Sequence, residues 1–357
     1  LMVNSCSKLQ LPLPVDVTKV KIAFGNVLMQ TAKNTEAFNI FQSLLNESTQ
    51  LSTTVKLELK YKIGSIFFNN GEFEKSVPYF KEVLSTFGIK FPTKRVITIV
   101  SLLWEITKQI GFSAGLKKLF AVKCDSSSLL KLRIFNKLAY SLYFDDMIVC
   151  FLTHFKCLNL ADTTVNSYEK AESYTLHIVP IYQIMNKKRS YKYFNKSIKI
   201  ATAVNRKDSY AFALQMKGLV DYYSANWTKC EKSLYLSIKN YRAYGDITGQ
   251  LLSEEHLWKM YHLRGLFDKS IQRMNNIFDI CKKSNEKYFL PLTKSALYLI
   301  NYLKTGVSNK HDLMEIEVSL AQVKPYLYHT EIGLYLCQTE LLQNNISQAF
   351  FRLRSLL

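Results

Sequence analysis

The sequence predicts an all-α protein in which helical hairpins of roughly 40 residues stack into a solenoid. Small side chains followed by larger apolar ones recur once per hairpin along the chain, which indicates a repeat protein. Glycine and proline number only 12 and 7 among 357 residues, which suits long helices better than the tight turns of a β-sandwich. A hydrophobic content of 48% is too high for a disordered chain, so we expect a folded array.

The clearest repeat unit spans Tyr61–Leu84. A small residue, Gly64, lies in its first helix, and Ser76, Phe80 and Val83 follow in its second helix at offsets of 12, 16 and 19 residues. The small residue lets two helices cross closely, and the aromatic ring fills the space beside the crossing. This pattern is typical of a tetratricopeptide-like α-solenoid, which is therefore the fold that we predict.

The same offsets recur along the rest of the chain. Six further sets share them: Gly25 with Ala37, Phe41 and Leu44; Ala139 with Phe151, Phe155 and Leu158; Ile178 with Ser190, Phe194 and Ser197; Gly218 with Cys230, Leu234 and Ser237; Trp258 with Ser270, Met274 and Ile277; and Cys337 with Ala349, Leu353 and Leu356. Most lead residues are separated by one hairpin length, but two intervals, around 92–125 and 290–320, are near twice that length. We interpret each long interval as containing a hairpin that has lost the pattern.

The predicted turns agree with the repeat. Three second helices open with an aromatic residue, any residue, Lys and a small residue, at Phe73–Ser76, Trp227–Cys230 and Phe267–Ser270. The aromatic ring can pack back onto the first helix of its hairpin while the lysine faces solvent. Gly71 and Gly265 supply turn backbone, where a positive φ costs glycine little.

Five segments follow from this pattern. We expect an N-terminal extension at 1–17, helical repeats at 18–90, an irregular apolar helical insert at 91–128, further repeats at 129–304, and C-terminal helices with a last repeat at 305–357. Pro92 breaks the first run and suits the first turn of the helix that follows it. Thr305–Asn309 is predicted as a loop before another helix.

Lysine and arginine outnumber aspartate and glutamate by 47 to 28, which gives a formal net charge of +19. This charge favours anionic partners such as RNA, anionic lipid or an acidic protein domain, although a solvated lysine-rich surface has the same composition. No nucleic-acid-binding motif is present, so nucleic acid is not the partner that we expect. A candidate basic patch spreads over a predicted turn and the helix after it, and consists of Lys187, Lys188, Arg189, Lys192, Lys196 and Lys199.

The most apolar run of the sequence is Val96–Ile106, which is too short to span a bilayer and contains Glu105. We interpret it as a buried or partner-facing helix, with peripheral contact to an anionic membrane as the alternative. The sequence shows no secretory signal.

The seven cysteines are scattered, odd in number and without a CxxC pair, which predicts a reduced, cytoplasmic protein. Cys150, His154 and Cys157 share one face of a predicted helix and could in principle hold a metal ion. They also lie in the apolar stripe of that helix, where a reduced cysteine behaves as a small hydrophobe. We therefore expect packing rather than a metal site, and no cofactor in this segment.

Catalytic motifs are missing from the sequence. Gly111–Gly115 is one residue too short for a phosphate loop, and Leu116 stands where that loop needs lysine. His256 and His262 do not have HExxH spacing, and no GxSxG elbow occurs. We therefore predict that the chain as given is not an enzyme.

Several stretches resemble the C-terminal helical-repeat region of soluble adenylyl cyclases, class III cyclases that carry an ATPase module. The resemblance lies in the hairpin Gly71–Ser76, in Phe91-Pro92 followed by the apolar helix Ile99–Trp104, in Leu158–Ala161, and in Gly218–Tyr223 with Asn226-Trp227. It implies a parent protein that makes cyclic AMP from ATP with a divalent metal. Because the cyclase and ATPase motifs are absent here, no catalytic residue is carried over, and we expect the chain to be a fragment. Bacterial relatives with kinase output modules have similar repeats.

A partner-binding surface is the function that we expect from such an array, because first helices of stacked hairpins line a concave side. The partner would be a protein, either the parent catalytic and ATPase domains or a peptide. Candidate contacts, chosen as exposed residues of first helices, are Asn69, Asp221, Tyr222 and Tyr261. The alternative is a basic α-solenoid that binds RNA or an anionic membrane surface through the lysine-rich patch.

Overall fold

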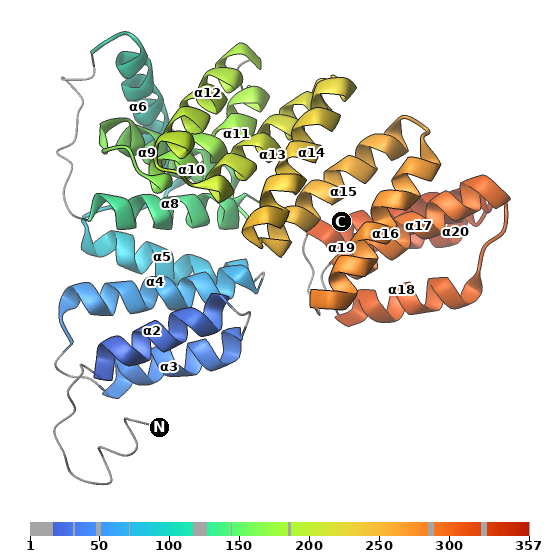
Figure 1. Cartoon of the computed structure of the whole chain (residues 1–357), viewed down its shortest axis with the longest axis horizontal. Helices are drawn as coiled ribbons and strands as arrows, with labels where there is room; N and C mark the ends of the chain where they lie inside the picture. The colour runs from blue at the N-terminus through green and yellow to red at the C-terminus, as the bar shows by residue number, and fades with distance from the viewer. Residues whose placement is uncertain are drawn as a thin grey trace. The chain divides into compact units, whose positions relative to one another are not determined.

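The computed structural model describes residues 17–30, 33–47, 51–70, 72–116, 127–143, 145–184, 187–284, 289–322 and 327–356. Within these ranges every regular element is a helix and no strand occurs, which confirms the all-α, tetratricopeptide-like fold (Figure 1). The chain divides into two compact units, Leu1–Val165 and Asn166–Leu357, and each is described by itself.

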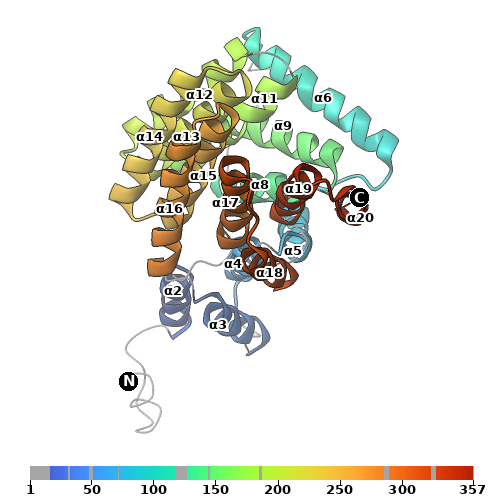
Figure 2. The same ribbon diagram turned by 90° about the vertical axis from the view of Figure 1, so that its right-hand side faces the viewer.

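The first unit is a stack of hairpins with one helix set aside. Its described helices are α2 (Val17–Gln30), α3 (Asn34–Glu47), α4 (Thr53–Asn69), α5 (Phe73–Thr86), α6 (Arg95–Ser113), α8 (Ser128–Leu142) and α9 (Met147–Thr163). Each helix from α2 to α5 packs on the next, and α5 then packs directly on α8. α6 lies outside this stack against α9, as Figure 2 also shows. The first long interval thus holds, in its described part, an added helix rather than a degenerate hairpin.

The second unit continues the hairpin pattern. Its described helices are α10 (Tyr168–Leu176), α11 (Ile178–Ile184), α12 (Lys187–Ala203), α13 (Lys207–Tyr223), α14 (Trp227–Tyr244), α15 (Ile247–Leu263), α16 (Phe267–Ser284), α17 (Phe289–Thr305), α18 (Lys310–Gln322), α19 (Leu327–Leu342) and α20 (Ile346–Leu356). The first helix of its first hairpin is broken into α10 and α11. Pro180 explains the break, because proline has no N–H and its ring clashes with the carbonyl of Leu176.

Close helix crossings at small residues are confirmed. A Cβ atom added to Gly25, Gly64 or Gly218 would lie 2.4 Å from Phe41, 2.8 Å from Phe80 or 2.7 Å from Leu234, in each case the residue 16 positions later. Serine hydroxyls tie the same crossings together. The Ser197 hydroxyl donates to the Ala171 carbonyl at 2.9 Å, and one repeat later the Ser237 hydroxyl donates to the Ala211 carbonyl at 2.9 Å.

The repeat register differs from the prediction in two hairpins. In the α8–α9 pair, the Cys150 thiol donates to the Ala139 carbonyl at 3.2 Å, so Cys150 and not Phe151 occupies the crossing. Phe151 is only half-buried. In the last pair, Leu353 is 41% exposed. The predicted pair Cys337 and Ala349 does meet, with the Cys337 thiol 3.5 Å from the Ala349 carbonyl, and a further close approach joins Gly333 and Leu356.

Four consecutive helix ends in the second unit share one backbone conformation. Asn205, Ala225, Gly245 and Gly265 all have positive φ and follow one another at a constant interval, half of the hairpin repeat. The residue after each donates its N–H back across the last turn, for example Asn226 to the Asp221 carbonyl at 2.8 Å and Leu266 to the Tyr261 carbonyl at 2.9 Å. These are Schellman caps, which satisfy free carbonyls and reverse the chain. The predicted turn at Gly265 is confirmed, whereas Gly71 lies outside the described residues.

The second long interval contains an intact hairpin, α17–α18, joined by a loop at residues 306–309, whereas the predicted loop began one residue earlier, at Thr305. One repeat after Trp258 and Ser270 the sequence has Tyr298 and Lys310, neither of them small, which is why the sequence pattern misses this hairpin. α17 packs on both α16 and α19, so α19 joins one hydrophobic cluster with α15 and α17 through Trp258, Leu292 and Ile332. α19 is thereby brought next to α15.

We expect Gly218→Val to lower the free energy of unfolding by about 2 kcal/mol, because the added methyl groups overpack the crossing against Leu234. Lys239→Val, at an exposed position of α14, is the control that introduces a β-branched residue into the same hairpin without the clash. Urea denaturation measures both variants. Equal losses of stability would show that the α13–α14 crossing is not tight.

Candidate functional site

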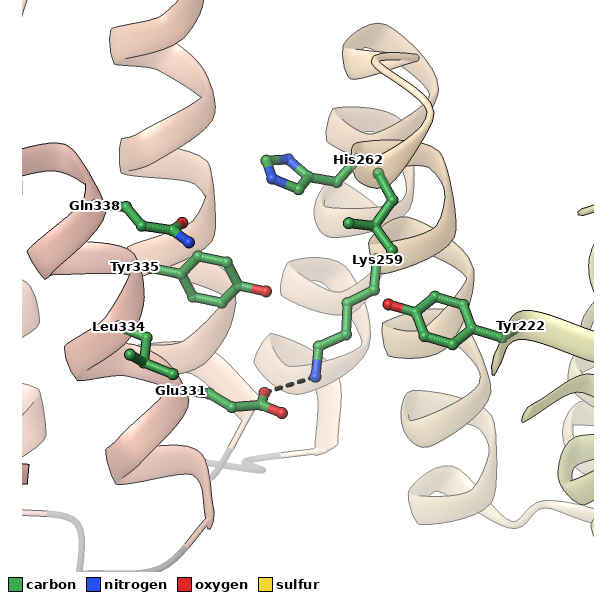
Figure 3. A pocket seen from close by; sticks show the side chains of 8 residues that line it. Tyr222, Lys259, His262, Glu331, Leu334, Tyr335 and Gln338 are labelled. Atoms are coloured by element: carbon green, nitrogen blue, oxygen red, sulfur yellow. Dashed lines mark hydrogen bonds and ion pairs between the residues drawn. The ribbon is translucent and has the colours of Figure 1, made fainter. Parts of the chain in front are cut away.

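A groove in the second unit is a candidate site among the described residues. It has a volume of about 270 Å³ and lies where α13, α15 and α19 meet. Its lining residues are Tyr222 from α13, Lys259, His262 and Leu263 from α15, and Glu331, Leu334, Tyr335 and Gln338 from α19 (Figure 3).

Helix geometry explains which side chains reach the groove. Glu331, Tyr335 and Gln338 stand at i, i+4 and i+7 and so share one face of α19. On α15, Trp258 is fully buried and its ring packs against Tyr335 at 6.0 Å between centroids. The next residue, Lys259, therefore points into the groove, as Figure 3 shows.

Lys259 is the electrostatic centre of the groove. Its Nζ lies 2.6 Å from Glu255 Oε1 and 2.6 Å from Glu331 Oε2. Burial disfavours the charged ammonium, but the two carboxylates outweigh burial and raise the pKa of Lys259 above its ordinary value. Burial also raises the pKa of Glu331, which Lys259 partly offsets. Two carboxyl groups thus face one ammonium group, and of the two only Glu331 lines the groove.

Aromatic and apolar groups surround this charged centre. Tyr222 and Tyr335 direct their hydroxyls toward Lys259 from opposite sides (Figure 3), and burial raises the pKa of both phenols, so both are neutral near pH 7. Burial lowers the pKa of His262, whose ring stands edge-on to Tyr335 at 6.4 Å. Leu263 and Leu334 form an apolar rim and are 62% and 42% exposed.

Only one of the four predicted contact residues, Tyr222, lines the groove. Asp221 is fully buried and accepts from Tyr191 and from Lys217 Nζ at 2.8 Å. Tyr261 is 1% exposed and donates its hydroxyl to Glu231 at 2.5 Å. The prediction that Asp221 and Tyr261 are exposed is wrong, because these equivalent positions point into the hairpin. Asn69 is exposed and accepts from Lys137 Nζ at 3.4 Å.

The residue directly after each of these two buried positions lies on the groove side of its helix, because neighbouring helix positions differ by about 100°. Tyr222 and His262 each follow one of them, occupy equivalent positions in successive hairpins, and both line the groove. The repeat spacing could therefore have found His262 once Tyr222 was chosen. The repeat spacing could not have found Lys259 and Glu331, because the two residues of this pair lie 72 positions apart in the sequence.

The predicted basic patch does not form a single surface. All six residues lie on α12 rather than on a turn and a helix. Lys187 lies 3.6 Å from Asp221 and donates to Ser224 at 2.8 Å, while Lys196 lies over the rings of Tyr174 and Tyr193 at 5.0 and 5.1 Å. The exposed members on one face are Lys188, Lys192 and Lys199; Arg189 is half-buried.

Cys150, His154 and Cys157 are packed in the core of the first unit. Cys150 and Cys157 donate to Ala139 and Asn136 at 3.2 Å each. Burial raises the pKa of Cys150 to about 12 and lowers that of His154 to about 4. Among the described residues no group of three His, Cys, Asp or Glu side chains could hold a metal ion.

The glycine pair Gly111–Gly115 lies at the C-terminal end of α6, where Gly115 has a φ of 86°. A phosphate loop instead precedes a helix, so that the N-terminal N–H groups of the helix face the phosphate. This segment therefore has the geometry of a helix cap.

Comparison with solved structures defines the class: this chain has a tetratricopeptide-like helical-repeat fold, built from stacked helical hairpins. It is similar to a Rap protein complexed with Competence and Sporulation Factor, with a TM-score of 0.52 and 12% identity over 95% of this chain and 96% of that chain. The apo form of RapI gives a TM-score of 0.52 and 12% identity over 84% of this chain and 96% of that chain.

A third similar structure is a Signal Transduction ATPase with Numerous Domains with a tetratricopeptide repeat sensor, from Pyrococcus horikoshii. Its TM-score is 0.48 at 16% identity, over 95% of this chain, and this chain spans only 45% of its length. At such identities these likenesses establish the fold alone. No protein-family model and no curated protein sequence matches the chain.

The buried His154 makes the first unit sensitive to acid. Its folded pKa of about 4 is below the unfolded value of about 6.5, so only the unfolded chain takes up this proton between those values. Its contribution to stability is therefore complete above pH 6.5 and falls by about 3 kcal/mol as the pH reaches 4. We expect His154→Leu to lose this part of the pH dependence, measured by urea denaturation from pH 7 to pH 4. If the free energy of unfolding of His154→Leu fell with pH as steeply as that of the wild type, His154 would not be the source of the acid sensitivity.

Proposed function

We propose that this chain is a non-catalytic, partner-binding repeat region and that the α13–α15–α19 groove binds a peptide segment of its partner. The observation that carries the proposal is the convergence of acidic, aromatic and apolar side chains from three helices on one hollow. The similar Rap protein was solved with Competence and Sporulation Factor, which supports this fold as one that holds a bound partner.

The groove favours a basic residue in that peptide. Glu331 keeps a partly exposed carboxylate beside Lys259, and a second cation could share it. The rings of Tyr222 and Tyr335 flank the same space, where a cation meets the negative face of an aromatic ring favourably. The exposed Leu263 and Leu334 then suit a neighbouring apolar residue of the peptide.

We expect an array of hexapeptides to show retention of sequences with lysine or arginine beside an apolar residue, and little retention of acidic ones. Glu331→Gln should weaken binding of a retained peptide about fivefold, which is about 1 kcal/mol, in fluorescence anisotropy. Glu82→Gln is the matched control, because Glu82 is also paired with a lysine but lies in the other unit. Equal effects of the two variants, or preference for acidic peptides, would reject the groove as a basic-peptide site.

We further propose that the parent is a soluble adenylyl cyclase-like signalling protein of the cytoplasm, with this segment as its regulatory part and no cofactor bound in it. The support is the sequence resemblance at Gly71–Ser76, Phe91-Pro92 and Gly218–Tyr223. The coding sequence upstream of Leu1 tests this proposal. Cyclase and phosphate-loop motifs there would agree with it, and an initiator codon preceded directly by untranslated sequence would contradict it.

Binding of RNA or an anionic membrane surface through α12 is the second candidate function. The exposed Lys188, Lys192 and Lys199 on one face favour it, whereas the internal contacts of Lys187 and Lys196 count against it. Filter binding of single-stranded RNA and vesicle co-sedimentation across a salt series distinguish the cases, since phosphate binding by these lysines must weaken steeply with salt.

A further inference from the structure

Helix α6 has its polarity reversed relative to an ordinary surface helix. Its fully buried residues are mainly polar, namely Thr98, Glu105 and Gln109, and the fourth is Gly111 near the C-terminal end of the helix. Thr98, Glu105 and Gln109 stand at i, i+7 and i+11, so they form one stripe, and α6 packs against α9. In most surface helices the buried stripe is apolar.

A hydrogen-bonded network fills the seam between α6 and α9. Asn159 Nδ2 of α9 donates to Glu105 Oε2 at 2.8 Å, and Gln109 Nε2 donates to Asn159 Oδ1 at 2.9 Å and to Asp162 Oδ2 at 3.0 Å. Lys108 Nζ lies 3.0 Å from Glu105 Oε1 and neutralises it. The paired polar groups hold α6 in place together with the half-buried Leu102, Ile106 and Phe112, and most of its other apolar side chains stay exposed.

The opposite side of α6 is an apolar face with one polar residue, the exposed Thr107, within it. Its members, all exposed by more than half except Ile99 at 40%, are Val96, Ile97, Ile99, Val100, Leu103, Trp104 and Ile110. Val96, Val100, Leu103 and Ile110 recur at i, i+4, i+7 and i+14, which places them in a line along the helix. This is the largest run of exposed apolar side chains on a single described helix.

Positive charge borders this face and negative charge is absent from it. Between Phe87 and Leu116 the sequence has four basic residues, Lys90, Lys94, Arg95 and Lys108, and one acidic residue, the buried Glu105. Two further lysines, Lys81 and Lys156, lie over the ring of Phe91 just before the helix, at 5.9 and 5.6 Å. A basic margin beside an apolar face is complementary to an anionic bilayer surface, with phosphate at the level of the cations and acyl chains below.

We propose that α6 is a peripheral membrane anchor, whose apolar face inserts into the interface of an anionic lipid bilayer while its polar seam stays on α9. Trp104, with the ammonium of Lys108 5.6 Å from its ring, lies at the edge of that face, where tryptophan suits the headgroup level. This inference is independent of the groove in the second unit.

An orientation in the plane of the interface fits α6 better than a spanning one. By length and composition alone, α6 is the one helix among the described residues that could cross a membrane. A crossing would strip Glu105 and Gln109 of their partners on α9 and place them in hydrocarbon together with Lys108, at high cost. In the interface plane the network remains intact and only apolar side chains leave water.

The test uses the full chain with large unilamellar vesicles made of phosphatidylcholine and phosphatidylserine, the second of which supplies the anionic surface. We expect co-sedimentation with these vesicles, weaker binding to pure phosphatidylcholine, and a blue shift of tryptophan emission. Trp104 is 53% exposed, whereas Trp258 is fully buried and Trp227 half-buried, so Trp104 is the tryptophan placed to report insertion. Trp104→Phe should abolish the shift and keep the binding within a factor of about three.

A matched pair of variants isolates the apolar face. Val100 on α6 and Val318 on α18 are 59% and 56% exposed, so each accepts glutamate without disturbing a core. Val100→Glu should reduce vesicle binding at least about tenfold, and Val318→Glu should leave it within about twofold. Lys94→Glu with Arg95→Glu should remove the preference for anionic vesicles.

Three results would overturn the anchor. The wild-type chain could fail to bind the anionic vesicles, or Val100→Glu and Val318→Glu could lose binding equally. Alternatively, sedimentation velocity could show that the wild type self-associates and that Val100→Glu converts it to a monomer, in which case a second copy of the chain covers the face.

Discussion

The structure depends on how closely the two helices of a hairpin can cross. At Gly25, Gly64 and Gly218 the large side chain of the second helix occupies the space that a Cβ atom would take. Where no glycine is present, serine hydroxyls bond to the carbonyl of the opposing helix, as Ser190 does with Ile178 at 2.7 Å and Ser270 with Trp258 at 3.0 Å. Both arrangements bring the two helix backbones of a hairpin close together, and the next hairpin then packs against this pair.

This constraint explains what the sequence could predict. Any chain with small residues at a fixed spacing and large apolar residues 16 positions later must bring those positions together, so the hairpins and most of their core were predictable. Side-chain direction was less predictable, since neighbouring helix positions differ by about 100°. That is why Tyr222 reaches the groove while Asp221 and Tyr261 do not. The reversed polarity of α6 could not be predicted either, because an apolar stripe gives no sign of whether it faces the core or the surface.

The groove arises where the regular repeat is interrupted. α17 contacts α16 on one side and α19 on the other, and α18 packs on α17. This arrangement places the acidic and aromatic face of α19 opposite Lys259 of α15. No motif in the sequence specifies such a pairing, because it depends on the path of an entire hairpin. In both units, the irregular intervals supply the features that a regular stack would not have: a mixed polar and aromatic groove in one, and an exposed apolar helix in the other.

The caps at Asn205, Ala225, Gly245 and Gly265 have a consequence for how such a chain can change in length. The helix ends in this region recur at a constant interval, so losing or duplicating the stretch between Asn205 and Gly245 would rejoin equivalent backbone conformations and keep the two helices of each remaining hairpin together. Loss of the stretch between Asn205 and Ala225 would also rejoin equivalent backbone conformations, but the second helix of a hairpin would then stand where a first helix belongs. Evolution of this region therefore proceeds most easily by whole pairs of helices.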